Sequence, residues 1–94
     1  MAHTPGQQVH VVLPRALLTL FSEAKPNVEM TAATVGAMID ELDARWPGMG
    51  DRLRDTTPAV RRHINIFVDG RRATLATALK PGAKIYVLTA ISGG

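Results

Sequence analysis

Cysteine is absent from this chain of 94 residues. A disulfide framework, a thiolate metal site and a cysteine nucleophile are therefore excluded within it. The histidines are His3, His10 and His63, and because their spacing matches no pattern of metal ligands, no metal site is expected. Ser22 and Ser92 are the only serines, and neither lies in the GxSxG turn of a serine hydrolase. The chain thus lacks a catalytic constellation, and we expect it to act as a protein cosubstrate rather than as an enzyme.

Aromatic side chains are scarce: the chain has one tryptophan, one tyrosine and two phenylalanines. Because proteins that bind single-stranded nucleic acid stack bases on aromatic rings, that function is poorly supported. The formal net charge is +3, from 11 basic and 8 acidic residues. Six arginines fall between positions 52 and 72: Arg52, Arg54, Arg61, Arg62, Arg71 and Arg72. A basic segment can bind nucleic acid or an acidic partner protein, but a solvated surface is the simpler interpretation.

Long apolar runs are missing as well. None approaches the roughly 20 residues that span a bilayer, so no membrane association is expected. Residues 1–8 form a polar leader without the apolar region of a signal peptide, which favours a cytoplasmic protein with a flexible start. The length and an ordinary composition, 46% hydrophobic and 20% charged, predict one domain over residues 1–94.

Several segments have the composition of β-strands or of their short partners. They are residues 9–13, 28–30, 63–68, 71–74 and 84–89. The Asp69-Gly70 pair predicts a tight hairpin turn between the third and the fourth, because glycine accepts the positive φ angles of such a turn. Residues 15–24 are apolar and must bury part of themselves, either as a short helical turn or as a loop packed onto the core.

The clearest helix is predicted over residues 35–46. Apolar residues recur there at helical spacing and line one face: Val35, Met38, Ile39, Leu42 and Trp46. Thr34 suits the N-cap, because its hydroxyl can accept a hydrogen bond from the first turn, and the Pro-Gly pair at 47–48 ends the helix. Asp40, Glu41 and Asp43 fall on the polar side and are expected to be solvated charges rather than a catalytic cluster.

The order of these segments is strand, strand, helix, strand, short strand, strand. One amphipathic helix can cover only one face of such a sheet. The order predicts an α+β fold, a β-grasp (ubiquitin-like) roll with a mixed sheet of about four or five strands and one main helix on one face. The first and last strands would lie side by side and parallel in its middle, joined by a crossover through the helix.

Alternation along the strands predicts an exposed apolar patch on the other face of the sheet. Five residues are expected to face the helix: Ile64, Ile66, Val68, Ile85 and Val87. Phe67, Tyr86 and Leu88 would then face away from the helix, near His10 and Val12. Exposed apolar patches mark interaction sites, so this one is a candidate for partner docking. In the alternative interpretation, residues 15–24 cover Phe67 and Tyr86.

The sequence ends in Gly93-Gly94, preceded by Ile91 and Ser92. Residues 90–94 have no periodic pattern and are expected to form a flexible tail, which from Ile91 onward reaches about 13 Å beyond the last strand. A terminal glycine has no Cβ, so its carboxylate could enter a narrow channel in another protein. After activation at the α-phosphate of ATP, a sulfur nucleophile could convert it to a thiocarboxylate, or an amine to an amide. Because the chain has no glycine-rich phosphate loop, a separate enzyme must bind the ATP.

Three strings stand in this order in the chain: INIFVDG at 64–70, LKPGAKIYVL at 79–88 and SGG at 92–94. Together they resemble the ThiS/MoaD family of ubiquitin-like sulfur carriers, and the likeness extends from Val9 onward. The long segment 48–62 is more similar to the carriers that feed cysteine synthesis and to longer MoaD-like proteins. The chain departs from the family in Ala83-Lys84, where an acidic residue is common, and in Ser92, where alanine or threonine is usual.

The resemblance implies that an E1-like adenylating enzyme (ThiF/MoeB-like) activates the carboxyl of Gly94, which becomes a thiocarboxylate. Further implied partners are a sulfur donor protein and a sulfur-accepting biosynthetic enzyme, whose active site Ile91, Ser92 and Gly93 would enter. Leu88 matches an apolar position that docks partner enzymes in the family. No bound cofactor is expected, since the adenylating partner uses the ATP. Two alternatives stay open, the small subunit of a molybdopterin synthase and a protein modifier that forms isopeptide bonds through Gly94. The sulfur acceptor also stays open among cysteine, thiamin, molybdopterin and related metabolites.

Overall fold

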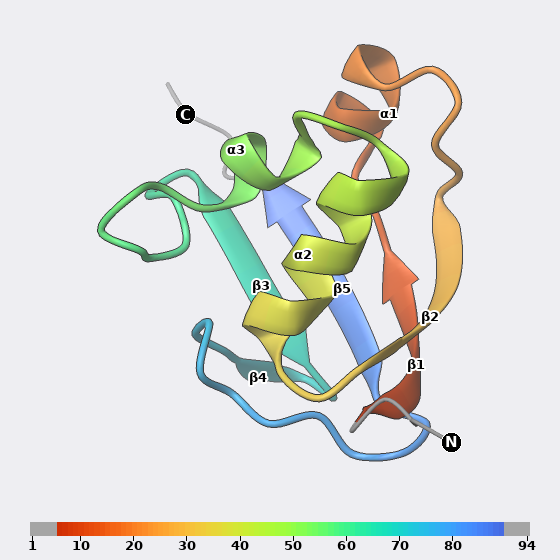
Figure 1. Cartoon of the computed structure of the whole chain (residues 1–94), viewed down its shortest axis with the longest axis vertical. Coiled ribbons are helices and arrows are strands. Elements are labelled where there is room, and N and C mark those ends of the chain that lie inside the picture. Colours follow the sequence, from red (N-terminus) through yellow and green to blue (C-terminus); the bar gives the residue numbers. More distant parts are fainter. Residues whose placement is uncertain (1–5, 90–94) are drawn as a thin grey trace.

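The computed structural model describes residues 6–89, and Figure 1 shows its arrangement. Within this range eight elements follow one another: β1 (Gln7–Val12), α1 (Arg15–Leu20), β2 (Asn27–Ala32), α2 (Val35–Arg45), α3 (Met49–Leu53), β3 (Ile64–Val68), β4 (Arg71–Arg72) and β5 (Lys84–Thr89). β5 begins and ends where the alternation of its residues predicted.

The strands form one mixed sheet in the order β2-β1-β5-β3-β4. The first and last strands, β1 and β5, are parallel neighbours in its middle, with Val11 opposite Ile85. β2 and β3 flank this pair in antiparallel orientation. Figure 1 shows α2 lying across one side of the sheet. This arrangement confirms the predicted β-grasp fold with its main helix on one face.

Helix α2 begins as the sequence predicts. Thr34 is its N-cap, since the Ala37 N–H donates a hydrogen bond of 3.1 Å to the Thr34 hydroxyl. The four buried residues of this helix are Val35, Met38, Ile39 and Leu42, all part of the core. Trp46 is the C-cap residue and is only half-buried, so α2 ends one residue earlier than predicted.

The core lies between α2 and one face of the sheet. Along β5, Ile85 and Val87 are buried in this core while their neighbours are exposed. Of the two alternatives for residues 15–24, the structure has the short helical turn, which is α1. Leu17 of α1 is buried in the same core. The helices therefore share one face of the sheet and leave the opposite face open.

The polar start of the chain is shorter than predicted. β1 begins at Gln7, because Gln7 and Gln8 pair with Ala32 and Thr31 of β2. Backbone pairing needs no apolar side chain, so the composition of these residues does not reveal it. Of the predicted flexible leader 1–8, the last two residues therefore belong to the sheet, and residues 1–5 lie outside the described range.

The predicted hairpin turn joins β3 and β4. Asp69 has a φ of 49° and Gly70 a φ of 87°, the left-handed values that a type I′ turn requires. The Lys84 N–H donates a hydrogen bond of 3.0 Å to the Asp69 carboxylate, which ties the turn to β5. β4 has two residues where the sequence predicted a partner strand over 71–74, so it covers only part of the outer edge of β3.

Candidate functional site

The open face of the sheet carries an apolar patch made by Val12, Phe67, Tyr86 and Leu88, here called the open-face patch. Tyr86 is 40% exposed and Leu88 43%, while Val12 and Phe67 are half-buried. Tyr86 lies opposite Val12 of β1 and opposite Phe67 of β3, so the three form a row across the middle of the sheet. The predicted exposure is confirmed for Tyr86 and Leu88, whereas Phe67 and Val12 are half-buried.

The alternative in which residues 15–24 cover this patch is wrong. Leu17 of α1 is buried in the core, on the other side of the sheet. The ring of Phe21 lies next to Gly48, at the start of α3. A Cβ placed on Gly48 would lie 3.6 Å from this ring. In Figure 1, α1 lies near the loop that joins α2 and α3. Among residues 6–89, no helix covers the open-face patch.

Polar groups border the patch on β1 and β2. The His10 side chain forms hydrogen bonds with the Asn27 amide oxygen at 3.0 Å and with the Glu29 carboxylate at 2.8 Å. Since both partners present an oxygen to an imidazole nitrogen, they favour the doubly protonated ring. The hydrogen bonds with Asn27 and then Glu29 raise the pKa of His10 above 6.5. In return, the hydrogen bond with His10 lowers the pKa of Glu29 below 4.5.

A positive charge borders the patch on β4. The guanidinium of Arg72 lies 6.0 Å from the centre of the Phe67 ring. This distance is at the limit for a cation–π contact and is consistent with the pairing of Phe67 with Arg72 across β3 and β4. Phe67 is thereby flanked by Tyr86 on one side and by a cation on the other.

The patch lies where β5 leaves the sheet. Leu88 is the last outward-facing residue of β5 before Thr89, which pairs with Ile64. The predicted tail residues Ile91, Ser92, Gly93 and Gly94 lie outside the described residues. The structure shows where β5 ends, and it brings three of the predicted site residues together: Phe67, Tyr86 and Leu88.

The acidic residues of α2 have roles in the fold. Asp43 accepts hydrogen bonds from the N–H groups of Gly48 and Gly50, at 3.1 and 2.8 Å, and so holds the start of α3. Glu41 pairs with Arg45 within α2 at 3.1 Å, and Asp40 pairs with Arg54. The contacts of Asp43 were missed by the sequence reasoning, because helical periodicity assigns it to the solvated side. Within residues 6–89 no three histidines or carboxylates come close enough to bind a metal ion.

Two arginines of the basic stretch between positions 52 and 72 make contacts within the fold: Arg54 pairs with Asp40, and Arg61 contacts α3. The Arg61 Nε donates a hydrogen bond to the Asp51 carbonyl, which fixes the loop before β3 against α3. Within this loop Asp55 accepts hydrogen bonds from Thr57 and Ala59, and the bond with the Thr57 hydroxyl is the main reason that the pKa of Asp55 is lowered. Among the described helices, none is long and apolar enough to cross a membrane.

The comparisons with known proteins agree with the fold. The model of the ThiS family matches residues 11–94. The sulfur carrier protein CysO of Mycobacterium tuberculosis is 30% identical over 92 residues, which cover 92% of this chain and 98% of that protein. The small archaeal modifier protein 3 of Haloferax volcanii is 33% identical over 66 residues, 66% of this chain and 71% of that protein. A CysO chain in the crystal structure of the Amycolatopsis orientalis BexX/CysO complex superposes with a TM-score of 0.82 at 30% identity, covering 92% of this chain and 99% of that one.

Proposed function

The chain belongs to the ThiS family, and we propose that it carries sulfur as a thiocarboxylate on the carboxyl group of Gly94. Its relatives include a sulfur carrier protein and a small archaeal modifier protein. The observation that carries the proposal is the open-face patch, an apolar surface without a covering helix at the end of β5. A partner that docks there meets the chain where the tail begins.

The chemistry starts at the Gly94 carboxylate. One of its oxygens attacks the α-phosphorus of ATP on an adenylating partner, pyrophosphate leaves, and an acyl adenylate forms. Hydrosulfide then attacks the carbonyl carbon, and AMP leaves with the carboxylate oxygen, so that the thiocarboxylate forms and one proton is released. The described residues of this chain contribute docking and orientation, because they hold no phosphate-binding loop.

The experiment measures the intact mass of the full chain after incubation with ATP, sulfide and an E1-like adenylating enzyme. Replacement of one oxygen by sulfur adds about 16 Da to the chain. The chain that lacks Gly94 should fold equally well and gain no mass, as should the full chain without ATP. An unchanged mass in the complete reaction would contradict the proposal.

A second function is favoured by the likeness to the small archaeal modifier protein 3. The same acyl adenylate can react with a lysine amine and form an isopeptide bond through Gly94. The two functions differ in the product: covalent adducts with other proteins, in place of the small gain in mass, would assign the chain as a modifier. If the tail instead stays in the pocket of one synthase, the chain should co-purify with that enzyme in a fixed ratio.

A further inference from the structure

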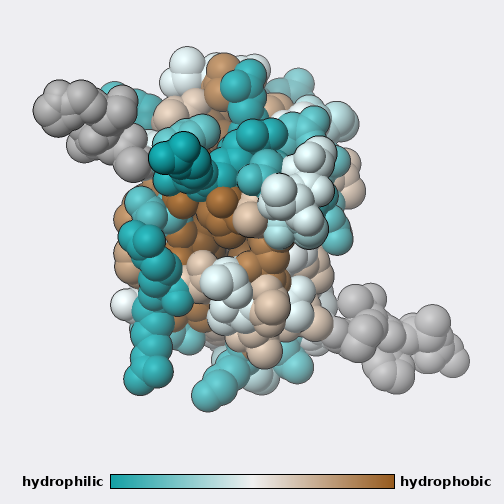
Figure 2. Space-filling view, turned by 90° about the vertical axis from the view of Figure 1, so that its left-hand side faces the viewer, coloured by the Kyte–Doolittle hydropathy of each residue, from teal (hydrophilic) through white to brown (hydrophobic). Residues whose placement is uncertain are grey.

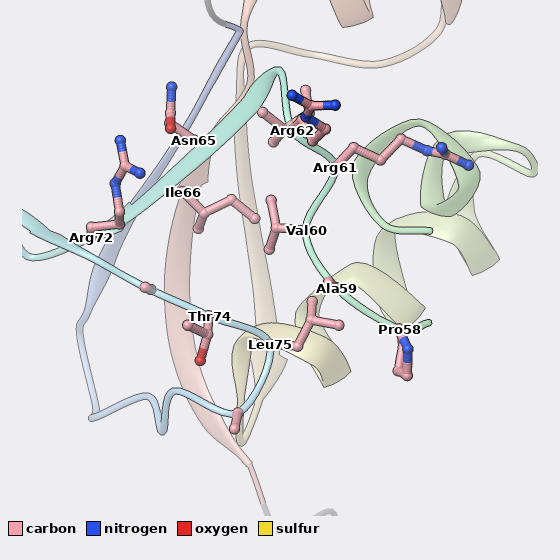
Figure 3. A pocket seen from close by; sticks show the side chains of 13 residues that line it. Pro58, Ala59, Val60, Arg61, Arg62, Asn65, Ile66, Arg72, Thr74 and Leu75 are labelled. Carbon is pink, nitrogen blue, oxygen red and sulfur yellow. The ribbon is translucent and has the colours of Figure 1, made fainter. Parts of the chain in front are cut away.

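The sheet has one edge at β2 and the other at β3 with its short partner β4. The edge of β3 is closed to another strand, because Ile64 and Ile66 are 5% and 1% exposed. Figure 3 shows Val60, from the loop before β3, pointing toward Ile66. Figure 2 shows apolar side chains at the bottom of a hollow on this side of the molecule, with hydrophilic side chains around it. The edge at which the sheet could continue is therefore β2.

The hydrogen bonds of β1 show which backbone groups of β2 point outward. The Leu13 N–H donates to the Pro26 carbonyl at 2.8 Å, next to the first pair of β2. Pairs that exchange hydrogen bonds alternate from there with pairs that do not. As this alternation requires, the His10 N–H, which lies opposite Glu29, donates to the Ala83 carbonyl on the β5 side at 2.9 Å. Every second residue of β2 thus turns its N–H and C=O groups away from β1, namely Asn27, Glu29 and Thr31.

These outward groups are open to a binding partner. β2 pairs only with β1, and among residues 6–89 the N–H and C=O groups of Asn27, Glu29 and Thr31 make no backbone hydrogen bond. All three residues are exposed. Figure 1 shows β2 at the right-hand border of the sheet with no helix or strand beyond it. A hollow of about 440 Å³, lined by Thr31 and by Arg45 of α2, lies beside this edge, so the helix does not close over it.

Residues 27–32 lack the features that protect the sheet edges of monomeric proteins. Such edges carry proline, lysine, a bulge or a charge that points outward. The segment NVEMTA contains neither proline nor lysine, and it pairs with β1 without a bulge. Its one charged side chain, that of Glu29, is 2.8 Å from the His10 imidazole of β1. The carboxylate is therefore held over the sheet rather than beyond its edge, and β2 can accept another strand.

A second copy of the chain fits this edge best in one register. Two copies of β2 related by a two-fold axis run antiparallel, with outward-facing residues opposite each other. Glu29 opposite Glu29 of the second copy would place like charges together, which is unfavourable. Glu29 opposite Asn27 would limit the pairing to residues 27–29. With Met30 on the axis, Glu29 lies opposite Thr31, residues 28–32 of both copies are paired, and no like charges meet.

We propose that two copies of this chain associate through β2, with Met30 on the two-fold axis and Glu29 of each copy opposite Thr31 of the other. Each Glu29 and the Thr31 opposite it exchange both backbone hydrogen bonds. The axis of such a pairing is perpendicular to the sheet, so both open-face patches lie on the same face and stay uncovered. The two β5 strands run in opposite directions and end at opposite sides of the dimer. The proposal does not rest on the proposed function, because association through β2 does not require Gly94.

The experiment follows the full chain over a range of concentrations. Because the paired segment is short, we expect a weak dimer, with a dissociation constant on the order of 0.1–1 mM. Sedimentation equilibrium should show mainly monomer at about 0.02 mM and largely dimer at about 2 mM. Hydrogen exchange measured by NMR identifies the interface. The amide hydrogens of Glu29 and Thr31 should exchange rapidly at the low concentration and slowly at the high one, whereas that of Asn27, outside the paired residues, should exchange rapidly at both.

Substitutions at Thr31 test the register. Thr31→Lys would face Glu29 of the second copy and should strengthen the dimer about fivefold, although it adds to the net charge of +3. Thr31→Glu should weaken the dimer about fivefold or more, because like charges then lie opposite each other. Thr56 is an exposed threonine in the loop between α3 and β3. Thr56→Lys and Thr56→Glu are therefore matched controls, which should change the dissociation constant less than about twofold. Urea denaturation should show that all these variants fold.

Several outcomes would overturn the proposal. One is a chain that stays monomeric at about 2 mM. Others are a dimer in which the amides of Glu29 and Thr31 still exchange rapidly, a weaker dimer in Thr31→Lys, and equal effects of the substitutions at Thr31 and Thr56. Loss of the dimer in Leu88→Asp but not in Thr31→Glu would assign the interface to the open-face patch and also overturn it.

Discussion

The substitution Leu88→Asp separates docking from folding. Leu88 is 43% exposed, so folding alone removes only part of its side chain from water. Complete burial of a leucine contributes about 1.5–3 kcal/mol. Folding buries a little over half of the Leu88 side chain and so gains a little over half of this free energy. The substitution should therefore lower the free energy of unfolding by about 1–2 kcal/mol. The protein should therefore remain folded.

The effect on docking should be larger. If a partner covers the exposed part of Leu88, the substitution removes about 1 kcal/mol of apolar burial. It also places a carboxylate in the interface, where an uncompensated polar group costs about 2 kcal/mol or more. The sum corresponds to a loss of affinity of roughly 100-fold for an E1-like adenylating enzyme.

Two matched variants make the measurement decisive. Val87 is the neighbour of Leu88 on β5 but is 1% exposed, so Val87→Asp should unfold the protein. Leu20 is 53% exposed but lies on α1, away from the open face, so Leu20→Asp should leave docking unchanged. Urea denaturation measures the first effect and isothermal titration calorimetry with the adenylating enzyme the second. Normal docking of Leu88→Asp, or equal loss in Leu20→Asp, would refute the reasoning.

Substitutions at Thr34, Gly70 and His10 test the fold and the border of the patch. Thr34→Ala should lower the free energy of unfolding by about 1 kcal/mol, because it removes the N-cap of α2, whereas Thr34→Ser should not; urea denaturation measures both. Gly70→Ala should cost about 1 kcal/mol in the same assay, since φ is 87° there. The stabilisation by His10, whose pKa is raised, is present below pH 6.5 and lost as pH rises through the raised pKa, so the stability gap to His10→Ala should close at high pH. Glu29, whose pKa is lowered, contributes above pH 4.5 and loses its contribution as pH falls through the lowered pKa; a gap independent of pH would contradict both assignments.

The parts of the fold that follow from local patterns were predictable. The alternation in β5 predicts that Val87 is buried and Leu88 exposed, regardless of which strands lie beside β5. The spacing of apolar residues in α2 predicts one buried face. The Asp69-Gly70 turn requires positive φ angles at two adjacent residues, and an Asp-Gly pair is a direct sequence signal for them. Each of these features can be recognised within a window of a few residues.

The parallel pairing of β1 and β5 followed from the order of the elements, but other contacts between distant segments were not predicted. Gln7 and Gln8 join the sheet because β2 offers them a partner, and their side chains carry no sign of it. The carboxylate of Asp43 caps α3 only because the turn after α2 brings Gly48 and Gly50 back to it.

The size of the open-face patch suits brief rather than permanent contacts. Tyr86 and Leu88 are each less than half exposed, so covering them contributes about 1 kcal/mol apiece, with smaller amounts from Val12 and Phe67. This sum is below the roughly 4 kcal/mol or more that association costs in lost translational and rotational freedom. Docking through the patch should therefore become stable only when a second contact, such as a tail held in an active site, adds to it. Removal of that second contact would release the chain, which the proposed function requires if one enzyme loads the thiocarboxylate and another consumes it.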